Sequence, residues 1–215
     1  PFFEYALTQE TFDRLHMERN AVWEAGEETV AFCYYEMEPT RAYCNFKPGY
    51  TFLAEAAVAW AERMMREEGK PASFGTFDTQ AALRETLTQK GYRATVRFPY
   101  RMLDLRKPLA YALPEGFSFV AMKDADLLKL SRMVARGFNR EDWREQSDTG
   151  ERRKRRSPHQ TVDLSVLIRD AGGAYACFAG MWYIPANRLA YLEPLFTVPE
   201  YRRMGLASAA LSELK

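Results

Sequence analysis

The stretch LAYLEPLFTVPEYRRMGLASAALSEL, residues 189–214, joins an apolar strand to a helix through a short loop. Pro199 ends the strand, and the Ala, Leu and Ser residues after Gly205 favour a helix. The loop sequence Arg202-Arg203-Met204-Gly205-Leu206-Ala207 contains small residues that let backbone N–H groups approach an anion. The helix dipole also favours negative charge at this end. The pattern therefore predicts a phosphate-binding junction between strand and helix.

Two other phosphate loops do not fit. A P-loop ends in Lys-Ser or Lys-Thr, and a dinucleotide-binding fold places Gly-x-Gly-x-x-Gly directly after a strand. The spacing Arg-x-x-Gly-x-Ala, preceded by Val198-Pro199-Glu200-Tyr201, resembles the acetyl-CoA pyrophosphate loop of the GNAT superfamily of N-acyltransferases. The alternative is an ordinary turn in which Gly205 only permits close packing.

Composition places the chain among globular proteins. Its 215 residues are 47% hydrophobic and 27% charged, with a net charge of +1, so no global attraction to nucleic acid or anionic membrane is expected. No apolar run has the ~18 residues of a spanning helix, and the first ten residues do not resemble a signal peptide. We therefore expect a cytoplasmic protein without membrane partners.

Cysteine and histidine are too few and too scattered for a metal or nucleophilic centre. Cys33, Cys44 and Cys177 lie in apolar runs and are expected to be buried free thiols. His16 and His159 are expected to be ordinary surface or packing residues. No metal cofactor is predicted.

One arrangement of elements occurs twice. Residues 47–60 align with residues 198–211 at a constant offset of 151, and both copies read as strand, Pro-x-Tyr and helix. Three strand-like runs precede the first copy, at 22–25, 29–35 and 42–46. Three also precede the second, at 164–169, 175–183 and 189–197.

The other expected elements follow from periodicity and turn signals. The first unit continues through a helix to Glu68, a strand over 73–77, a helix over 79–89 and a strand over 93–105. The second opens with a strand over 117–121 and a helix capped by Asp124. Its apolar side carries Leu127, Leu128, Leu130, Val134 and Phe138, and residues 139–160 read as a polar loop with some helix.

These elements predict an α+β fold of two tandem GNAT-like units, each a mixed, mostly antiparallel sheet flanked by helices. We place the first unit at 1–106, a linker at 107–116 and the second unit at 117–215. At the offset of 151, Lys215 corresponds to Met64. The second unit is therefore expected to lack its final strand, helix and strand.

The resemblance implies that acetyl-CoA is the co-substrate of the second unit. Backbone amides of Met204, Gly205, Leu206, Ala207 and Ser208 would hold the pyrophosphate, and Arg202 or Arg203 would add a charged contact. The preceding strand would splay at a bulge, which frees main-chain groups of Phe196, Thr197 and Val198 for the pantetheine arm. Pro194, which cannot donate, fits a disrupted ladder.

Acetyl transfer to an amine needs a base, because a lysine-like amine has a pKa of about 10.4. Glu193 is the expected base, and Tyr191 shares its face of the strand. A salt-bridged structural role for Glu193 is equally open. A strand amide near Phe196 would stabilise the oxyanion. The family's usual tyrosine acid would lie past Lys215.

The first unit departs from the pattern where it matters. Thr51, Ala54 and Glu55 replace Arg202, Gly205 and Leu206, so this unit is expected to bind no acetyl-CoA. It resembles the degenerate half of tandem GNAT proteins, with a role in shaping the acceptor cleft.

The run Glu151-Arg152-Arg153-Lys154-Arg155-Arg156 is read as a solvated loop, because it lacks interleaved aromatic residues for base stacking. Trp143, Trp182 and Tyr183 are either pocket or core residues.

Three functions follow, in order of preference. The first is an acetyl-CoA-dependent N-acetyltransferase acting on a small-molecule or peptide amine by direct transfer in a ternary complex. The second is a non-catalytic acyl-CoA-binding or regulatory protein, and the third, a nucleic-acid-binding protein. Whether the chain forms a homodimer is open.

Overall fold

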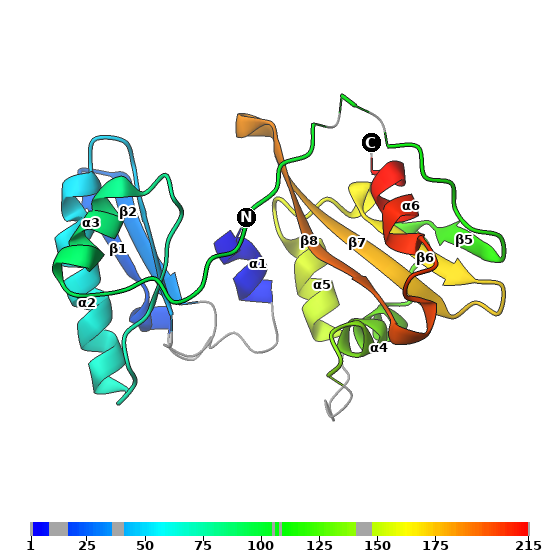
Figure 1. Cartoon of the computed structure of the whole chain (residues 1–215), viewed down its shortest axis with the longest axis horizontal. Coiled ribbons are helices and arrows are strands. Elements are labelled where there is room, and N and C mark those ends of the chain that lie inside the picture. Colours follow the sequence, from blue (N-terminus) through cyan, green and yellow to red (C-terminus); the bar gives the residue numbers. More distant parts are fainter. Residues whose placement is uncertain are drawn as a thin grey trace. The chain divides into compact units, whose positions relative to one another are not determined.

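A computed structural model describes residues 2–8, 17–35, 41–104, 106–107, 109–140 and 148–214. The chain divides into two compact units (Figure 1). The N-terminal unit is Thr11–Arg101, and the C-terminal unit combines Pro1–Glu10 with Met102–Lys215. These bounds differ from the expected ones at both ends, because the first helix and the 107–116 segment pack with the C-terminal unit. Tyr111 N–H, for example, donates to Ser212 Oγ at 3.0 Å.

The N-terminal unit is built on a four-stranded sheet of order β1-β2-β3-β4. Strands β1, β2 and β3 form an antiparallel meander, and β4 is parallel to β3. The strands are β1 (Ala21–Ala25), β2 (Glu28–Tyr35), β3 (Ala42–Phe46) and β4 (Phe74–Gly75); the helices are η1 (Met17–Arg19), η2 (Thr51–Leu53), α2 (Ala54–Glu67) and α3 (Ala81–Gln89).

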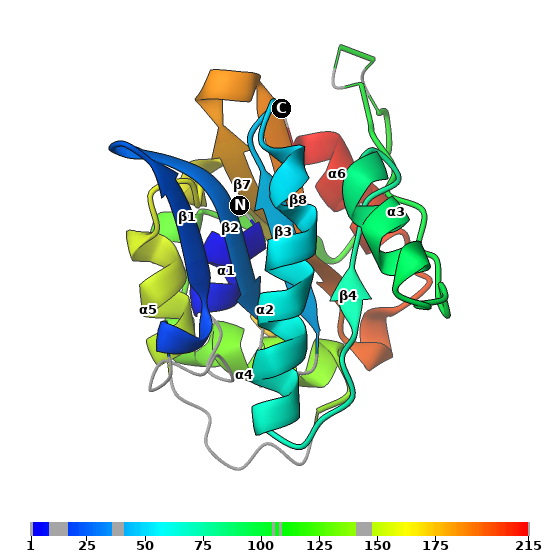
Figure 2. The same cartoon turned by 90° about the vertical axis from the view of Figure 1, so that its left-hand side faces the viewer.

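Helix α2 lies across this sheet, with α3 beside it (Figure 2). Its apolar residues recur at helical spacing and are buried: Ala54, Ala57, Val58, Ala61 and Met65. They pack against the β2 and β3 face, the first three near Cys33 and Cys44 and the last two near Tyr35 and Ala42. All three cysteines are buried free thiols, as predicted.

The C-terminal unit has a four-stranded antiparallel sheet of order β5-β6-β7-β8. Its strands are β5 (Phe117–Val120), β6 (Val166–Asp170), β7 (Tyr175–Ile184) and β8 (Leu189–Thr197). Its helices are α1 (Phe2–Thr8), α4 (Leu127–Gly137), α5 (Thr149–Arg156) and α6 (Leu206–Glu213), with short 3₁₀-helices η3 (Met122–Asp124), η4 (Val162–Leu164), η5 (Pro185–Asn187) and η6 (Pro199–Tyr201).

Two helices cover opposite faces of this sheet (Figure 1). Helix α6 packs on the face that carries Ile168 and Ala179, whereas α4 packs on the face that carries Leu167 and Phe178. The alternation of inward residues along β6 and β7 follows the two-residue period of a strand. The junction between β8 and α6 is therefore attached to a sheet that is covered on both faces.

Several expectations need correction. The strand expected over 93–105 is wrong for the described residues 93–104, which pair with no strand. Val96, Phe98 and Tyr100 are each more than 60% exposed, since no sheet edge is paired with them. The helix cap expected at Asp124 is Asp126, whose Oδ1 accepts from Lys129 N–H at 3.0 Å. Within the segment 139–160, expected to be a polar loop with some helix, residues 149–156 form α5.

Candidate functional site

The junction between β8 and α6 leaves amide donors at the start of the helix. Four residues, 202–205, separate η6 from α6, and both Arg203 and Gly205 have left-handed backbones, with φ of 65° and 86°. The first helical bond runs from Ala209 N–H to Gly205 O at 3.0 Å. The N–H groups of Leu206, Ala207 and Ser208 therefore have no helical partner. Such a concave set of donors suits an anion.

Gly205 is the N-cap of α6 and supplies no side-chain cap. A Cβ added there would meet only Pro114 Cγ, at 4.0 Å. The need for glycine is thus the left-handed backbone and not crowding. Met204 and Arg203 are exposed, whereas Leu206 beneath the loop is 1% exposed and anchors α6 in the core.

The two arginines of the loop have different roles. Arg202 Nε donates to Thr197 O at 3.1 Å, and its Nη2 donates to Gly137 O at 3.0 Å and Asn139 Oδ1 at 3.1 Å. Arg202 therefore ties the loop to the end of β8 and the end of α4. Arg203 makes no hydrogen bond or ion pair with the described residues. It is the arginine available to an anion.

Tyr201 anchors the loop from the other side. Its hydroxyl donates to Asp170 Oδ2 at 2.6 Å, and its ring packs edge-on against Phe117. This hydroxyl, together with the backbone N–H of Ala174, lowers the pKa of Asp170. The same bond to the Asp170 carboxylate raises the pKa of Tyr201. The Asp170 carboxylate at the end of β6 thus fixes Tyr201 at the end of η6, the segment that leads to α6.

A bulge interrupts the pairing of β7 with β8. Ala179 faces Leu195 and Met181 faces Leu192, so Gly180 stands opposite two residues, Glu193 and Pro194. A Cβ at Gly180 would lie 2.7 Å from Glu193 O, which excludes any larger residue without a shift. Trp182 Nε1 donates to Glu193 O at 2.9 Å and holds the bulge. The isolated glycine inside this apolar strand is a sequence signal not used in the predictions above, and it could have located the bulge.

The register decides which main-chain groups face outward. Val198 N–H donates to Ala176 O at 3.0 Å. Main-chain groups of an antiparallel strand alternate between its two edges, so Phe196 also faces β7, and Leu195 and Thr197 face the other edge. The free groups expected around Phe196–Val198 thus belong to Leu195 and Thr197. Within the described residues, β8 is an edge strand with no partner on that side.

The two proposed catalytic side chains lie on one face of β8. Tyr191 pairs with Trp182, and Glu193, two residues further on, stands at the bulge. Both side chains are half-buried, and both have partners. Leu192, between them, packs toward α6 on the opposite face. Tyr191, Glu193 and the amide-lined loop are therefore carried by one strand and its extension.

Comparison with known proteins bears on the fold. No protein-family model and no curated protein matches the sequence. The structure is similar to a GCN5-related N-acetyltransferase from Sphaerobacter thermophilus, with a TM-score of 0.59 and 17% identity. It is also similar to a tandem GNAT protein from the clavulanic acid biosynthesis pathway, with a TM-score of 0.54 and 16% identity. The fold is that of the GNAT superfamily.

The likeness to these GNAT structures covers nearly all of the chain but not all of theirs. It extends over 91% of this chain and 66% of the first protein, and over 100% of this chain and 74% of the second. The chain thus spans about two thirds of the length of the first. The strand, bulge, loop and helix described above all lie in the C-terminal unit.

The basic run belongs to the C-terminal unit, and most of its charges have partners there. Lys154 and Glu151 form a buried ion pair at 2.6 Å, each with 9% of its side chain exposed. Arg155 Nη2 donates to Met122 O, and Arg152 pairs with Asp148, both at 2.6 Å. The expectation of a solvated loop is therefore wrong, since α5 uses several of its charges to pack.

The remaining candidates are placed as follows. No group of three or more His, Cys, Asp or Glu side chains in the described ranges could hold a metal ion. Trp182 is 1% exposed and packs against Tyr5, and Tyr183 pairs with Ala190. His16 and Trp143 lie outside the described residues. None of the helices in the described part of the chain is long and apolar enough to span a bilayer.

Proposed function

We propose that the C-terminal unit is an acetyl-CoA-dependent N-acetyltransferase acting on a primary amine. The observation that carries this proposal is the set of helix-start amides of Leu206, Ala207 and Ser208, placed directly after a bulged edge strand. The fold alone would not be sufficient, since one fold can host several activities. The donors, the left-handed Gly205 and the uncommitted Arg203 together fit a pyrophosphate.

Binding would use the loop and the outer edge of β8. The amides at the start of α6 would hold the pyrophosphate oxygens, and Arg203 would add a charge-assisted contact. The C=O of Leu195 and the N–H of Thr197 would pair with the pantetheine amides as a neighbouring strand does. Thr197 O is already used by Arg202 Nε. This arrangement directs the thioester toward the bulge.

The chemistry is direct transfer within a ternary complex. Glu193 would take the proton of the ammonium group, directly or through water, so that the neutral amine can attack the thioester carbonyl. The Leu195 N–H, which faces outward beside the bulge, would donate to the developing oxyanion. The C–N bond forms, the C–S bond breaks, and the leaving thiolate takes up a proton. Tyr191 would line the acceptor side.

Calorimetry and mass spectrometry test the proposal separately. Titration should show one acetyl-CoA site per chain, with ATP as a phosphate-bearing control that binds much more weakly. A panel of small amines, aminoglycosides, amino acids and peptides, incubated with acetyl-CoA, should yield at least one acetylated product. Binding without any transfer would favour a non-catalytic acyl-CoA-binding protein. The absence of acetyl-CoA binding would contradict both.

A further inference from the structure

Gln160 contains an oxygen that the fold leaves unsatisfied. Its Oε1 is the only buried side-chain nitrogen or oxygen without a hydrogen-bond partner in the described part of the chain. Such a group destabilises the state in which it is buried, and native structures contain few of them. We therefore ask which donor forms a hydrogen bond with this oxygen when the protein binds a ligand.

Gln160 lies in a row of side chains that leads to the proposed catalytic strand. It forms an antiparallel bridge with Trp182, flanked by bonds from Tyr183 N–H to His159 O (2.8 Å) and from Thr161 N–H to Met181 O (3.0 Å). Directly opposed residues place their side chains on the same face of a sheet. Trp182 is in turn opposite Tyr191. Gln160, Trp182 and Tyr191 thus form one row across three chain segments.

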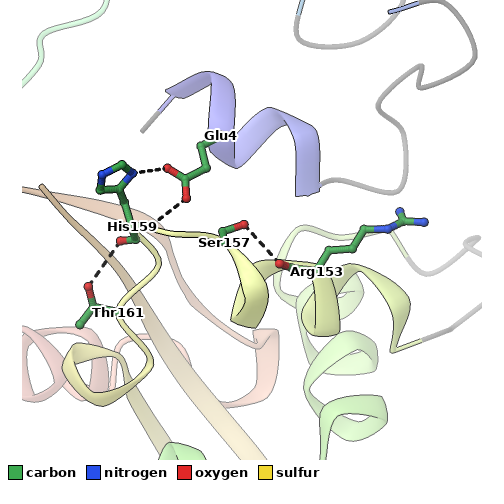
Figure 3. A network of polar contacts seen from close by, with 5 residues as sticks. All are labelled: Glu4, Arg153, Ser157, His159 and Thr161. Atoms are coloured by element: carbon green, nitrogen blue, oxygen red, sulfur yellow. Dashed lines mark hydrogen bonds and ion pairs between the residues drawn. The ribbon is translucent and has the colours of Figure 1, made fainter.

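Helix α1 packs over this row. The Tyr5 ring meets the Trp182 ring edge-on, with centroids 5.7 Å apart at 90°. Glu4 points from α1 to His159 (Figure 3): its Oε1 accepts from the His159 N–H at 2.8 Å, and its Oε2 lies 2.7 Å from His159 Nδ1. Gln160 follows His159 in sequence and stands opposite Trp182. It therefore lies between two of the contacts that hold α1.

The attachment of α1 is suited to release. The helix has seven residues, and a helix this short is not stable by itself in water. Its order therefore depends on tertiary contacts, namely those of Glu4 and Tyr5 and the burial of Ala6 and Thr8, and such an element can open without the rest of the unit. The unsatisfied oxygen of Gln160, next in sequence to His159, destabilises the state in which it is buried.

We propose that α1 is a displaceable cover on the acceptor side, and that Gln160 and Trp182 beneath it bind the acceptor. This inference rests on the proposed acetyltransferase function. Gln160 Oε1 accepts an N–H from the acceptor, and Trp182 packs against its apolar or aromatic body in place of Tyr5. Two strand spacings, about 10 Å, separate Gln160 from Tyr191. Glu193, the proposed base, lies two residues further along β8 than Tyr191, so the acceptor class is an amine whose apolar body carries a second N–H donor roughly 10–12 Å from the acetylated nitrogen.

The probe pair is a tripeptide amide with an aromatic second residue, whose terminal N–H lies about 10 Å from the α-amine when extended, and the matching methyl ester, which lacks that N–H. A site built to bond an N–H discriminates against the analogue without it. In the wild-type protein the amide should have a KM about tenfold below that of the ester. Gln160→Met, which keeps the shape but not the acceptor atom, should remove this preference and leave acetyl-CoA affinity unchanged.

Hydrogen exchange of α1 gives a readout independent of catalysis. Adding the amide should speed exchange at residues 2–8 of the wild-type protein, and the ester should have less effect. Without ligand, Glu4→Ala/Tyr5→Ala should speed this exchange, whereas Gln160→Met should slow it by removing the orphan oxygen from the closed state. Asp148→Ala, which breaks an ion pair on neighbouring α5, should leave exchange of α1 unchanged.

A matched glutamine controls for a structural role. Gln80 is satisfied at both ends, because its Nε2 donates to Cys44 O at 2.7 Å and its Oε1 accepts from Phe77 N–H at 2.9 Å. Gln80→Met should therefore lower the melting temperature, whereas Gln160→Met should maintain or raise it. A lowered melting temperature together with faster α1 exchange in Gln160→Met would make Gln160 a structural residue and overturn the inference.

The two proposals fail in different ways. If the wild-type protein acetylates other amines but treats amide and ester alike, the inference is wrong and the proposed function stands. If no amine is acetylated, the proposed function fails, and the effect of the amide on α1 exchange still decides whether Gln160 and Trp182 form a binding site. No effect of the amide on α1 in that case would overturn the inference too.

Discussion

The two units present the same strand, 3₁₀-helix and helix, but they treat the helix N-terminus differently. In the N-terminal unit η2 runs directly into α2, and the N–H groups of Leu53 and Ala54 donate to Tyr50 O and Thr51 O. In the C-terminal unit residues 202–205 separate η6 from α6, and Gly205 turns the backbone into the left-handed region. An anion site thus depends on the separation of two helical segments and not merely on their order.

The sheet edges differ as well. The outer edge of β3 is occupied by β4, through the pairs Ala42 with Phe74 and Tyr43 with Gly75. The corresponding edge of β8 has no partner among the described residues. The pairing of β2 with β3 is regular, whereas that of β7 with β8 is bulged. The N-terminal unit therefore offers no bulge or open edge comparable to that of β8.

The largest expected effect is the loss of acetyl-CoA binding in Gly205→Glu. The substitution forces a side chain onto a backbone with φ of 86° and adds a negative charge where the pyrophosphate should lie. We expect affinity to fall by at least about 100-fold in calorimetric titration.

The control for this variant must come from the other unit. Ala54 is the equivalent position at the offset of 151, but it is 2% exposed, so a glutamate there would disrupt the core. Phe52 in η2 is 72% exposed, so a glutamate at this position adds the same charge without disrupting the core. Phe52→Glu should leave binding unchanged, and equal losses in both variants would contradict the assignment of the site to the C-terminal unit.

The next largest effect is expected for Glu193→Gln. If Glu193 removes the acceptor's proton, turnover should fall by about 10²-fold to 10⁴-fold, while acetyl-CoA affinity stays within a few-fold. Glu213→Gln, an exposed acid at the end of α6, should behave as wild type. Steady-state kinetics with an identified amine decide the matter. An unchanged turnover number would reduce Glu193 to a structural acid.

A smaller effect is expected from Tyr201→Phe, with Tyr50→Phe as its counterpart at the offset of 151. Loss of the bond to Asp170 should lower stability and weaken acetyl-CoA binding, whereas Tyr50, whose ring packs on Phe52, should tolerate the change. The pKa of Asp170 is lower in the folded state than in the unfolded state. Its carboxylate therefore contributes to folding stability fully above the unfolded pKa of about 3.9, and this contribution is lost as the pH falls through the folded-state pKa.

Urea unfolding at several pH values tests this sign. The difference between the wild-type protein and Tyr201→Phe should be full near pH 7 and should shrink below about pH 4. A difference that grew on acidification would show that the bond to the Asp170 carboxylate is not its source.

The smallest effect is expected at the basic run, which has no counterpart in the N-terminal unit. We expect no specific nucleic-acid binding, since its charges are partly used within the fold and stacking partners are lacking. Fluorescence anisotropy with duplex and single-stranded DNA or RNA at two salt concentrations checks this. Micromolar binding at physiological salt, lost when Arg153 and Arg156 are changed to Ser, would promote a nucleic-acid function.

The sequence alone determined the elements whose signals are local. Period-two and helical patterns placed β2, β3, β7 and β8 and the helices α2 and α6, because burial of one side of an element is visible in the spacing of its apolar residues. Gly205 and its neighbours predicted the phosphate loop for a similar reason, since backbone conformation and helix polarity act over a few residues.

The tertiary structure decided everything that depends on partners distant in sequence. The local sequence pattern could not show that the 93–104 segment has no strand partner or that α1 belongs to the C-terminal unit. It also could not show that the Arg202 side chain donates a hydrogen bond to Gly137 O. Nor could it show which amides of β8 face outward, because a register is a property of two strands. Gln160 illustrates the same limit, since an unsatisfied oxygen exists only once the surrounding chain has buried it.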